Sequence, residues 1–210
     1  MELGTRRIFA GLAAVALAGG AITATAATAR AASIQCGWSC ITFAADAYGT
    51  SYVSAILARG AEQGSAVTLA ASGNHEQEDF ESIYVGTTTQ LWQDGLVPIT
   101  LAKNWPGYKV YEYEFIPGAQ DSDLCIGTAA TAGNDTEVSL QPCGVNDQTL
   151  WLPETSESVD GFEPMIAGTD TRSTQPYVLT AGSTGSALFT YEQVSPVKTS
   201  QLWQEVIGVL

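Results

Sequence analysis

The segment from Cys125 to Trp151, CIGTAATAGNDTEVSLQPCGVNDQTLW, constrains the fold more than any other part of the chain. Its two cysteines enclose a Gly-Asn-Asp turn at residues 133–135 and an alternating Val-Ser-Leu run at residues 138–140. Alternating apolar and polar residues beside such a turn are typical of an antiparallel hairpin, which the cysteine pair is placed to bridge. We expect a further strand at Trp151 to complete this unit.

The same unit occurs three times along the chain. Tyr177 and Trp203 are as far apart in the sequence as Cys125 and Trp151, and a Thr-Ala pair coincides in the two segments. Between these ends the register is open, because the apolar run at residues 188–190 matches Val-Ser-Leu only if two residues are deleted. Another copy runs from Ser54 to Phe80, where phenylalanine replaces the tryptophan. Repetition of one unit at a fixed length predicts a repeat architecture.

Elsewhere, short runs of Val, Thr, Ile, Leu and Tyr alternate with Gly, Asn, Asp, Ser and Pro, which predicts an all-β fold. The apolar run at residues 53–61 is ambiguous between helix and strand. Residues 81–110 intervene between two copies and contain Gln90-Leu91-Trp92, which has the sequence of a repeat end but follows no Val-x-Leu strand at the right distance. Residues 81–110 either form an insertion or supply strands of the middle unit.

The first residues predict export from the cytoplasm. Two arginines, Arg6 and Arg7, precede an Ala-rich apolar run, and small residues follow it. This pattern indicates a Sec or twin-arginine signal peptide over residues 1–31 and a secreted single domain over residues 32–210. All four cysteines follow the signal, and an even number in an exported chain favours disulfides. Of the three possible pairings we favour Cys36–Cys40 with Cys125–Cys143.

Charge and motifs exclude several classes of function. The 210-residue chain has a net charge of −14, which disfavours binding to nucleic acid and to anionic membranes. The sequence has no phosphate-binding Gly-rich loop, dinucleotide fingerprint or Cys-x-x-Cys metal motif, so we predict no cofactor and no metal.

Catalysis is not expected either. His75 is the only histidine, and no Gly-x-Ser-x-Gly motif offers a nucleophile. Acidic groups at residues 76–81 and 121–123 could in principle hold calcium or form a glycosidase pair, but with 22 acidic residues a solvated surface is the default.

Three units that end in Gln-x-Trp or its remnants, with a cysteine pair across the middle hairpin, resemble the ricin B-chain-like β-trefoil lectins, including those that actinobacteria secrete. The resemblance implies an all-β β-trefoil with three pseudo-repeats, at about residues 50–80, 115–155 and 165–210, and an insertion at about 81–110. It also implies that the closing aromatic side chains form the core, namely Phe80, Trp151 and Trp203.

Members of this family that bind galactose use three features in each competent unit: an aspartate two residues after the first cysteine, an aromatic ring two residues before the second, and an Asn-Gln pair before the tryptophan. The aspartate orients the sugar hydroxyls and the ring stacks on the sugar. In this chain the aspartate position holds Ile56, Gly127 and Leu179. The ring position holds Ala70, Gln141 and, depending on the register, Gln193 or Tyr191.

The resemblance therefore predicts carbohydrate binding by the third unit, with Tyr191 as the stacking platform and Gln201 as a polar contact. Further candidates are Gln141 and Asp147 in the second unit and Trp105 and Tyr108 in residues 81–110. The expected partner is an extracellular glycan or polysaccharide. A protein-binding or inhibitory trefoil that has lost sugar binding, with a secreted protein as partner, is the alternative, and a polysaccharide hydrolase ranks third.

Overall fold

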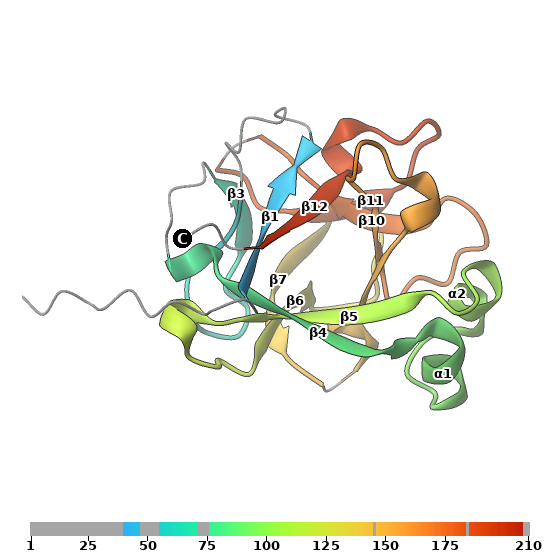
Figure 1. Cartoon of the computed structure of the whole chain (residues 1–210), viewed down its shortest axis with the longest axis horizontal. Coiled ribbons are helices and arrows are strands. Elements are labelled where there is room, and N and C mark those ends of the chain that lie inside the picture. The colour runs from blue at the N-terminus through green and yellow to red at the C-terminus, as the bar shows by residue number, and fades with distance from the viewer. Residues whose placement is uncertain (1–39, 47–54, 71–75, 145, 184, 208–210) are drawn as a thin grey trace, which may run out of the picture. The chain divides into compact units, whose positions relative to one another are not determined.

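The computed structural model describes residues 40–46, 55–70, 76–144, 146–183 and 185–207 (Figure 1). These residues all belong to one unit, Ser33–Leu210. The signal peptide predicted at residues 1–31, Cys36 and His75 lie outside the described residues. None of the helices in the described segments is long and apolar enough to cross a membrane.

Six strands form a closed ring. Antiparallel pairing runs in the order β12-β1-β4-β5-β8-β9, and a backbone bridge between Glu163 and Trp203 joins the last strand to the first. Closure leaves this barrel without exposed edges. The strands are β1 (Cys40–Ala45), β4 (Phe80–Thr87), β5 (Lys109–Phe115), β8 (Trp151–Pro153), β9 (Met165–Ala167) and β12 (Trp203–Ile207).

Three hairpins pack together beside the barrel. Each hairpin makes the same backbone bridge to the next one: Ala66 pairs with Ser139, Glu137 with Phe189, and Ala187 with Thr68. By this rule the first residues of the three pairs are equivalent to one another, and so are the second residues. A six-stranded barrel with three hairpins related in this way is a β-trefoil, so the predicted fold class is confirmed. The hairpins are β2 (Ala55–Ala58) with β3 (Val67–Ala70), β6 (Leu124–Thr128) with β7 (Thr136–Pro142), and β10 (Tyr177–Thr180) with β11 (Phe189–Glu192).

The closing aromatic residues Phe80, Trp151 and Trp203 lie in the main core. The indole N–H of Trp151 donates to the carbonyl of Ile126 at 2.8 Å, and that of Trp203 donates to the carbonyl of Leu179 at 2.9 Å. Each indole thus ties a barrel strand to the hairpin of its own repeat. The ring of Phe80 has no N–H group, so this side chain is held by packing alone, against Phe43 and Phe115.

The disulfide Cys125–Cys143 bridges the second hairpin, as predicted, with a Cα–Cα distance of 5.1 Å. Cys40 is also disulfide-bonded. Cys36, the partner predicted for Cys40, lies outside the described residues.

Only part of segment 81–110 is an insertion. The ribbon of β4 and β5 pairs from Phe80 opposite Phe115 to Thr87 opposite Lys109, so the segment's two ends are barrel strands. Its middle forms two short helices at the tip of that ribbon, α1 (Thr88–Gln93) and α2 (Ile99–Asn104) (Figure 1). Gln90-Leu91-Trp92 lies in α1 and is therefore not a repeat end.

The helix α1 begins at a capping box. The Thr87 hydroxyl accepts from the backbone N–H of Gln90, whose side chain accepts from the backbone N–H of Thr87. The buried face of this tip joins a second core cluster, made of Leu91, Val97, Leu101, Trp105, Val110, Leu150, Leu152, Ile166 and Val178. The connecting segments contain single turns of 3₁₀ helix, namely η3 (Glu76–Glu78), η4 (Pro117–Ala119), η5 (Asp147–Thr149), η6 (Thr155–Glu157) and η7 (Thr199–Gln201).

Candidate ligand site on the third hairpin

The contacts between hairpins settle the register of the third unit. By the rule stated above, Thr68, Ser139 and Phe189 are equivalent residues. Counting two residues on from each, Ala70, Gln141 and Tyr191 share one position. The hairpin ladders agree, because Tyr191 lies opposite Val178 as Gln141 lies opposite Cys125. Tyr191, and not Gln193, therefore occupies the position of the stacking ring.

The same register moves the aspartate position of two units by one residue. Leu179 is not at that position: it is 2% exposed, belongs to the core and corresponds to Ile126 of the second unit. Thr180 is the residue that corresponds to Gly127, and in the first hairpin the pairing of Ile56 with Leu69 moves the position from Ile56 to Leu57. In the third unit this shift arises because the segment between hairpin and closing tryptophan is one residue shorter. Ile126 lies 25 residues before Trp151, whose indole it binds, whereas Leu179 lies 24 residues before Trp203.

A pocket of about 300 Å³ opens beside Tyr191. Tyr191 is half-buried, its ring meets Phe189 edge-on, and its hydroxyl donates to Asp135. That hydrogen bond raises the pKa of Tyr191, so the ring stays a neutral phenol. The pocket is lined by Asn134, Thr180, Tyr191, Glu192, Val194, Lys198, Ser200 and Gln201.

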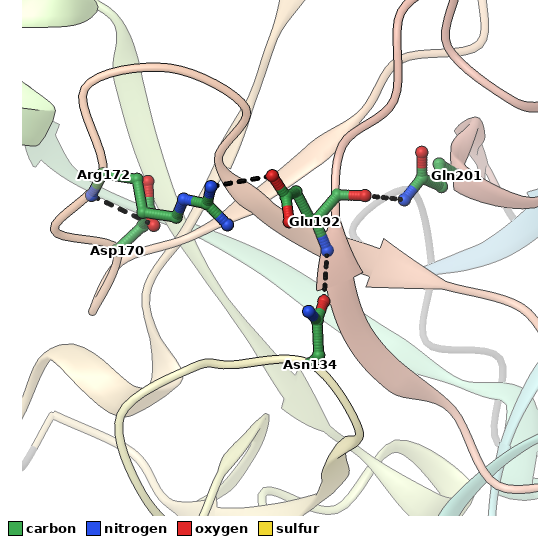
Figure 2. Close-up of polar contacts among 5 residues, drawn as sticks. All are labelled: Asn134, Asp170, Arg172, Glu192 and Gln201. Carbon is green, nitrogen blue, oxygen red and sulfur yellow. Dashed lines mark hydrogen bonds and ion pairs between the residues drawn. The ribbon is translucent and has the colours of Figure 1, made fainter.

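Glu192, the residue after Tyr191, is held from three sides (Figure 2). Its backbone N–H donates to the side-chain oxygen of Asn134 at 2.9 Å, and its carbonyl accepts from Gln201 at 3.0 Å. Its carboxylate pairs with the Arg172 guanidinium at 2.7 Å. Both partners of this ion pair are about one-third exposed, so the carboxylate is oriented and still open to solvent.

Gln201 is a clamp in this site. It is buried, and its amide nitrogen donates to Glu192 and to the Thr180 hydroxyl at 3.3 Å. Its amide oxygen accepts from the backbone N–H of Val194 at 3.3 Å. Since these bonds use both N–H groups and the oxygen, Gln201 shapes the pocket wall and is not free to bind a ligand strongly.

The equivalent place in the second unit is closed. A Cβ on Gly127 would lie 2.7 Å from the backbone oxygen of Gln148, because the turn η5 packs directly on that glycine. The predicted contact Gln141 is buried and donates to Ser139. Asp147 is half-buried in η5, and burial raises the pKa of its carboxyl group. The structure therefore does not bring Gln141 and Asp147 together around a cavity.

The two candidates from residues 81–110, Trp105 and Tyr108, also lie away from the pocket at Tyr191. Trp105 is 8% exposed, lies in the second core cluster and donates its indole N–H to Glu154 at 2.8 Å. Of the two roles open to Trp105, a ligand contact or a buried anchor of the loop, the structure shows the buried anchor, because the interior of the inserted tip needs a large apolar side chain. Tyr108 is half-buried and lines a different cavity. Within the described residues, no group of three or more His, Cys, Asp and Glu side chains could hold a metal ion.

Comparison with known proteins supports the fold. No protein-family model matches the chain, and no curated protein matches it. Among solved structures, a designed three-fold symmetric protein, ThreeFoil, aligns with a TM-score of 0.55 at 13% identity over 80% of this chain and 98% of that one. The BEL β-trefoil aligns with a TM-score of 0.53 at 16% identity over 81% of this chain and 93% of that one.

A mosquitocidal holotoxin aligns with a TM-score of 0.55 at 13% identity over 81% of this chain. The match covers only 17% of the toxin chain, so this protein corresponds to a small part of that molecule. At these identities the similarities define a structural class, and the protein is a β-trefoil.

Proposed function

We propose that this protein is a secreted, ricin B-like trefoil that binds carbohydrate without catalysis, at the third hairpin. The observation that carries the proposal is the position of Tyr191. Its ring borders a pocket of about 300 Å³ at the register position where galactose-binding members of the family that the sequence resembles carry their stacking ring.

The lining supplies the polar contacts that a sugar requires. The ring of Tyr191 offers an apolar face, and Ser200 offers a hydroxyl group. The aspartate of the family is missing, but Glu192 is among the lining residues, and its carboxylate beside the pocket is oriented by Arg172. A charge-assisted hydrogen bond from a sugar hydroxyl to Glu192 would replace the one that the aspartate makes.

A broad glycan array and retention on immobilised polysaccharides test this proposal. We expect binding by the unmodified protein and a loss of about tenfold or more in Tyr191→Ala, because the stacking surface is removed. Tyr84→Ala is the matched control, since Tyr84 is an exposed tyrosine outside the pocket. Silence across the array, or an equal loss in both variants, would contradict the proposal.

A second candidate function is protein binding through the inserted tip. Of the seven exposed large hydrophobic residues in the described chain, five lie on the end of β4 and on the tip: Tyr84, Val85, Trp92, Leu96 and Ile99. Such concentrations of apolar side chains commonly mark protein contacts. This function would be favoured over sugar binding if a protein from culture fluid bound to the unmodified chain but not to the Trp92→Ser variant, and if competing sugars did not displace it.

A hydrolase ranks below both candidates. It would require turnover of a polysaccharide that a single carboxylate substitution abolishes, and assays of the purified protein on labelled polysaccharides would detect it.

A further inference from the structure

A second and larger cavity, of about 760 Å³, lies at the barrel and shares no lining residue with the pocket at Tyr191. Its walls come from three parts of the chain: the return from the inserted tip into β5, the segment from β8 to β9, and the start of β12. The residues that matter here are Tyr108, Tyr111, Glu163, Trp203 and Glu205.

Strand geometry directs two carboxylates into this cavity. Trp203 faces the core, and Glu205 stands two residues further along β12, so both side chains lie on the same face of the strand. Glu163 exchanges both backbone hydrogen bonds with Trp203, at 2.8 and 2.9 Å. Because directly opposite residues of an antiparallel pair share a face, the Glu163 side chain projects to that side as well.

Glu205 is held in place by a neighbour. The hydroxyl of Tyr113, which is buried in the core, donates to one carboxylate oxygen of Glu205 at 2.6 Å. Burial and the Glu205 charge raise the pKa of Tyr113 well above its ordinary value, so this hydroxyl remains a donor. The other carboxylate oxygen of Glu205 has no protein partner in the described residues.

These two negative charges are not compensated within the described part of the chain. The one ion pair between described residues joins Arg172 to Glu192, at the other pocket. Lys109 lines the cavity but is exposed and pairs with neither glutamate. Burial raises the pKa of Glu163, and the nearby Glu205 charge raises it further.

Aromatic surface accompanies the carboxylates. Tyr111 is half-buried beside the cavity and stacks on Tyr113, with ring centroids 6.3 Å apart and planes 20° apart. Tyr108 adds a second partly exposed ring. Carboxylates and aromatic rings together recognise organic cations, because the first neutralise the charge and the second attract it through the ring face. An anionic ligand would be repelled by the same lining.

We propose that this cavity binds an organic cation, a primary amine or a guanidinium group, between Glu163 and Glu205 and against the ring of Tyr111. The volume is within the usual range of small-molecule sites, roughly 300–1,000 Å³. The charged group could belong to a free amine or to a lysine or arginine side chain of a peptide, and the chemistry of recognition is the same for both. The proposal is independent of sugar binding at Tyr191.

Calorimetric titration in about 0.15 M salt, where long-range attraction is screened, tests the proposal. The probes are butylamine, agmatine and the capped tripeptide acetyl-Gly-Lys-Gly-amide, with butanol as the neutral analogue of butylamine. We expect at least one cation to bind at a single site and butanol not to bind. Comparing the affinities of butylamine and agmatine with that of the tripeptide shows whether the site prefers a free cation or a lysine side chain within a peptide.

Isosteric variants locate the site. Glu163→Gln and Glu205→Gln are each expected to weaken binding of the cation by about tenfold, and the double variant to abolish it. Glu157→Gln is the matched control, since it removes the same charge from an exposed residue that does not line the cavity. Unchanged unfolding midpoints would show that the variants fold.

Three results would overturn the proposal. They are no cation binding at millimolar concentration, equal binding of butanol, and equal losses in Glu157→Gln and the cavity variants. Because no residue is shared between the two pockets, Tyr191→Ala should leave cation binding within twofold of the unmodified protein, and failure of either test leaves the other proposal standing.

Discussion

The second and third hairpins are attached to the barrel in the same way, but only the third has a pocket beside it. In both, an indole N–H from the closing tryptophan holds a backbone carbonyl of the hairpin. In the second, the turn η5 lies directly on Gly127 and leaves no room beside it for a side chain. In the third, Thr180 occupies the equivalent position and lines a pocket. The unit that best matches the family in sequence is thus the closed one, so similarity of frame does not report on the site.

Removal of the disulfide from the second hairpin should have the largest effect on this comparison. Replacing Cys125 and Cys143 together by serine opens a loop whose ends are 18 residues apart, and the loop-entropy model gives a loss of about 3 kcal/mol in the free energy of unfolding. Urea titration measures it. The pocket of the third hairpin has no disulfide among its lining residues, so sugar binding by the folded variant should be retained. A loss below about 1 kcal/mol would show that the second hairpin does not depend on its cross-link.

The next effect concerns the equivalent positions Gly127 and Thr180. We expect Gly127→Ala to cost about 2 kcal/mol, since the new Cβ would lie 2.7 Å from a backbone oxygen. Thr180→Ala should cost less, about 1 kcal/mol, because it loses two hydrogen bonds beside a pocket but meets no steric clash. Thermal unfolding of the two variants compares them, and equal costs would remove the distinction between a closed and an open unit.

A pH effect is expected from the loop that precedes the third hairpin. Asp170 is buried there, and burial raises its pKa from 3.8 to about 6, although the backbone N–H of Arg172 donates to it. The folded state therefore binds a proton more tightly than the unfolded state. Its stabilising contribution is present below pH 4 and is lost as the pH rises through 6, by about 3 kcal/mol.

Denaturant titrations at pH 4 and pH 7 of the unmodified protein and of Asp170→Asn measure this contribution. The asparagine variant should show a smaller fall in stability between the two values. If the unmodified protein instead gains stability from this group as the pH rises through the window, the assignment is wrong.

The smallest effect should come from the ion pair of Arg172 and Glu192. Both side chains are about one-third exposed, so Arg172→Ala is expected to lower stability only slightly, and less again in high salt. The same variant should weaken sugar binding more than it weakens folding, because it frees the Glu192 carboxylate to move. Binding and unfolding measured on one sample separate the two effects.

The repeat of hairpin and closing aromatic residue predicts an all-β repeat architecture, because each copy carries the same strand alternation and core side chain. The resemblance to the ricin B-like family narrows this prediction to a β-trefoil, which the structure confirms. The register of the third unit was not predictable from spacing alone. A one-residue difference between Leu179 and Trp203 is absorbed in a connecting segment, and only the bridges between hairpins reveal it. Spacing alone therefore places the aspartate position on Leu179, a core residue, whereas the structure places it on Thr180.

The two short helices have a local signal in the sequence. Thr87 and Gln90 are spaced as a capping box, which marks the start of a helix at Thr88. The role of Glu192 had no such signal, because its partners Asn134 and Arg172 are distant in sequence and meet it only after folding. Asn134 was recognised as a turn residue, and its contact with the next repeat depends on how the hairpins pack.

That turn at residues 133–135 has a consequence for how such a protein evolves. It belongs to the second repeat, yet Asn134 and Asp135 hold Glu192 and Tyr191 of the third. Duplicating a single repeat would therefore copy only half of the pocket, and the other half would be missing unless the new neighbour carried a matching turn. Whether a repeat has a pocket at this position can thus change through a few residues in turns, with the barrel untouched.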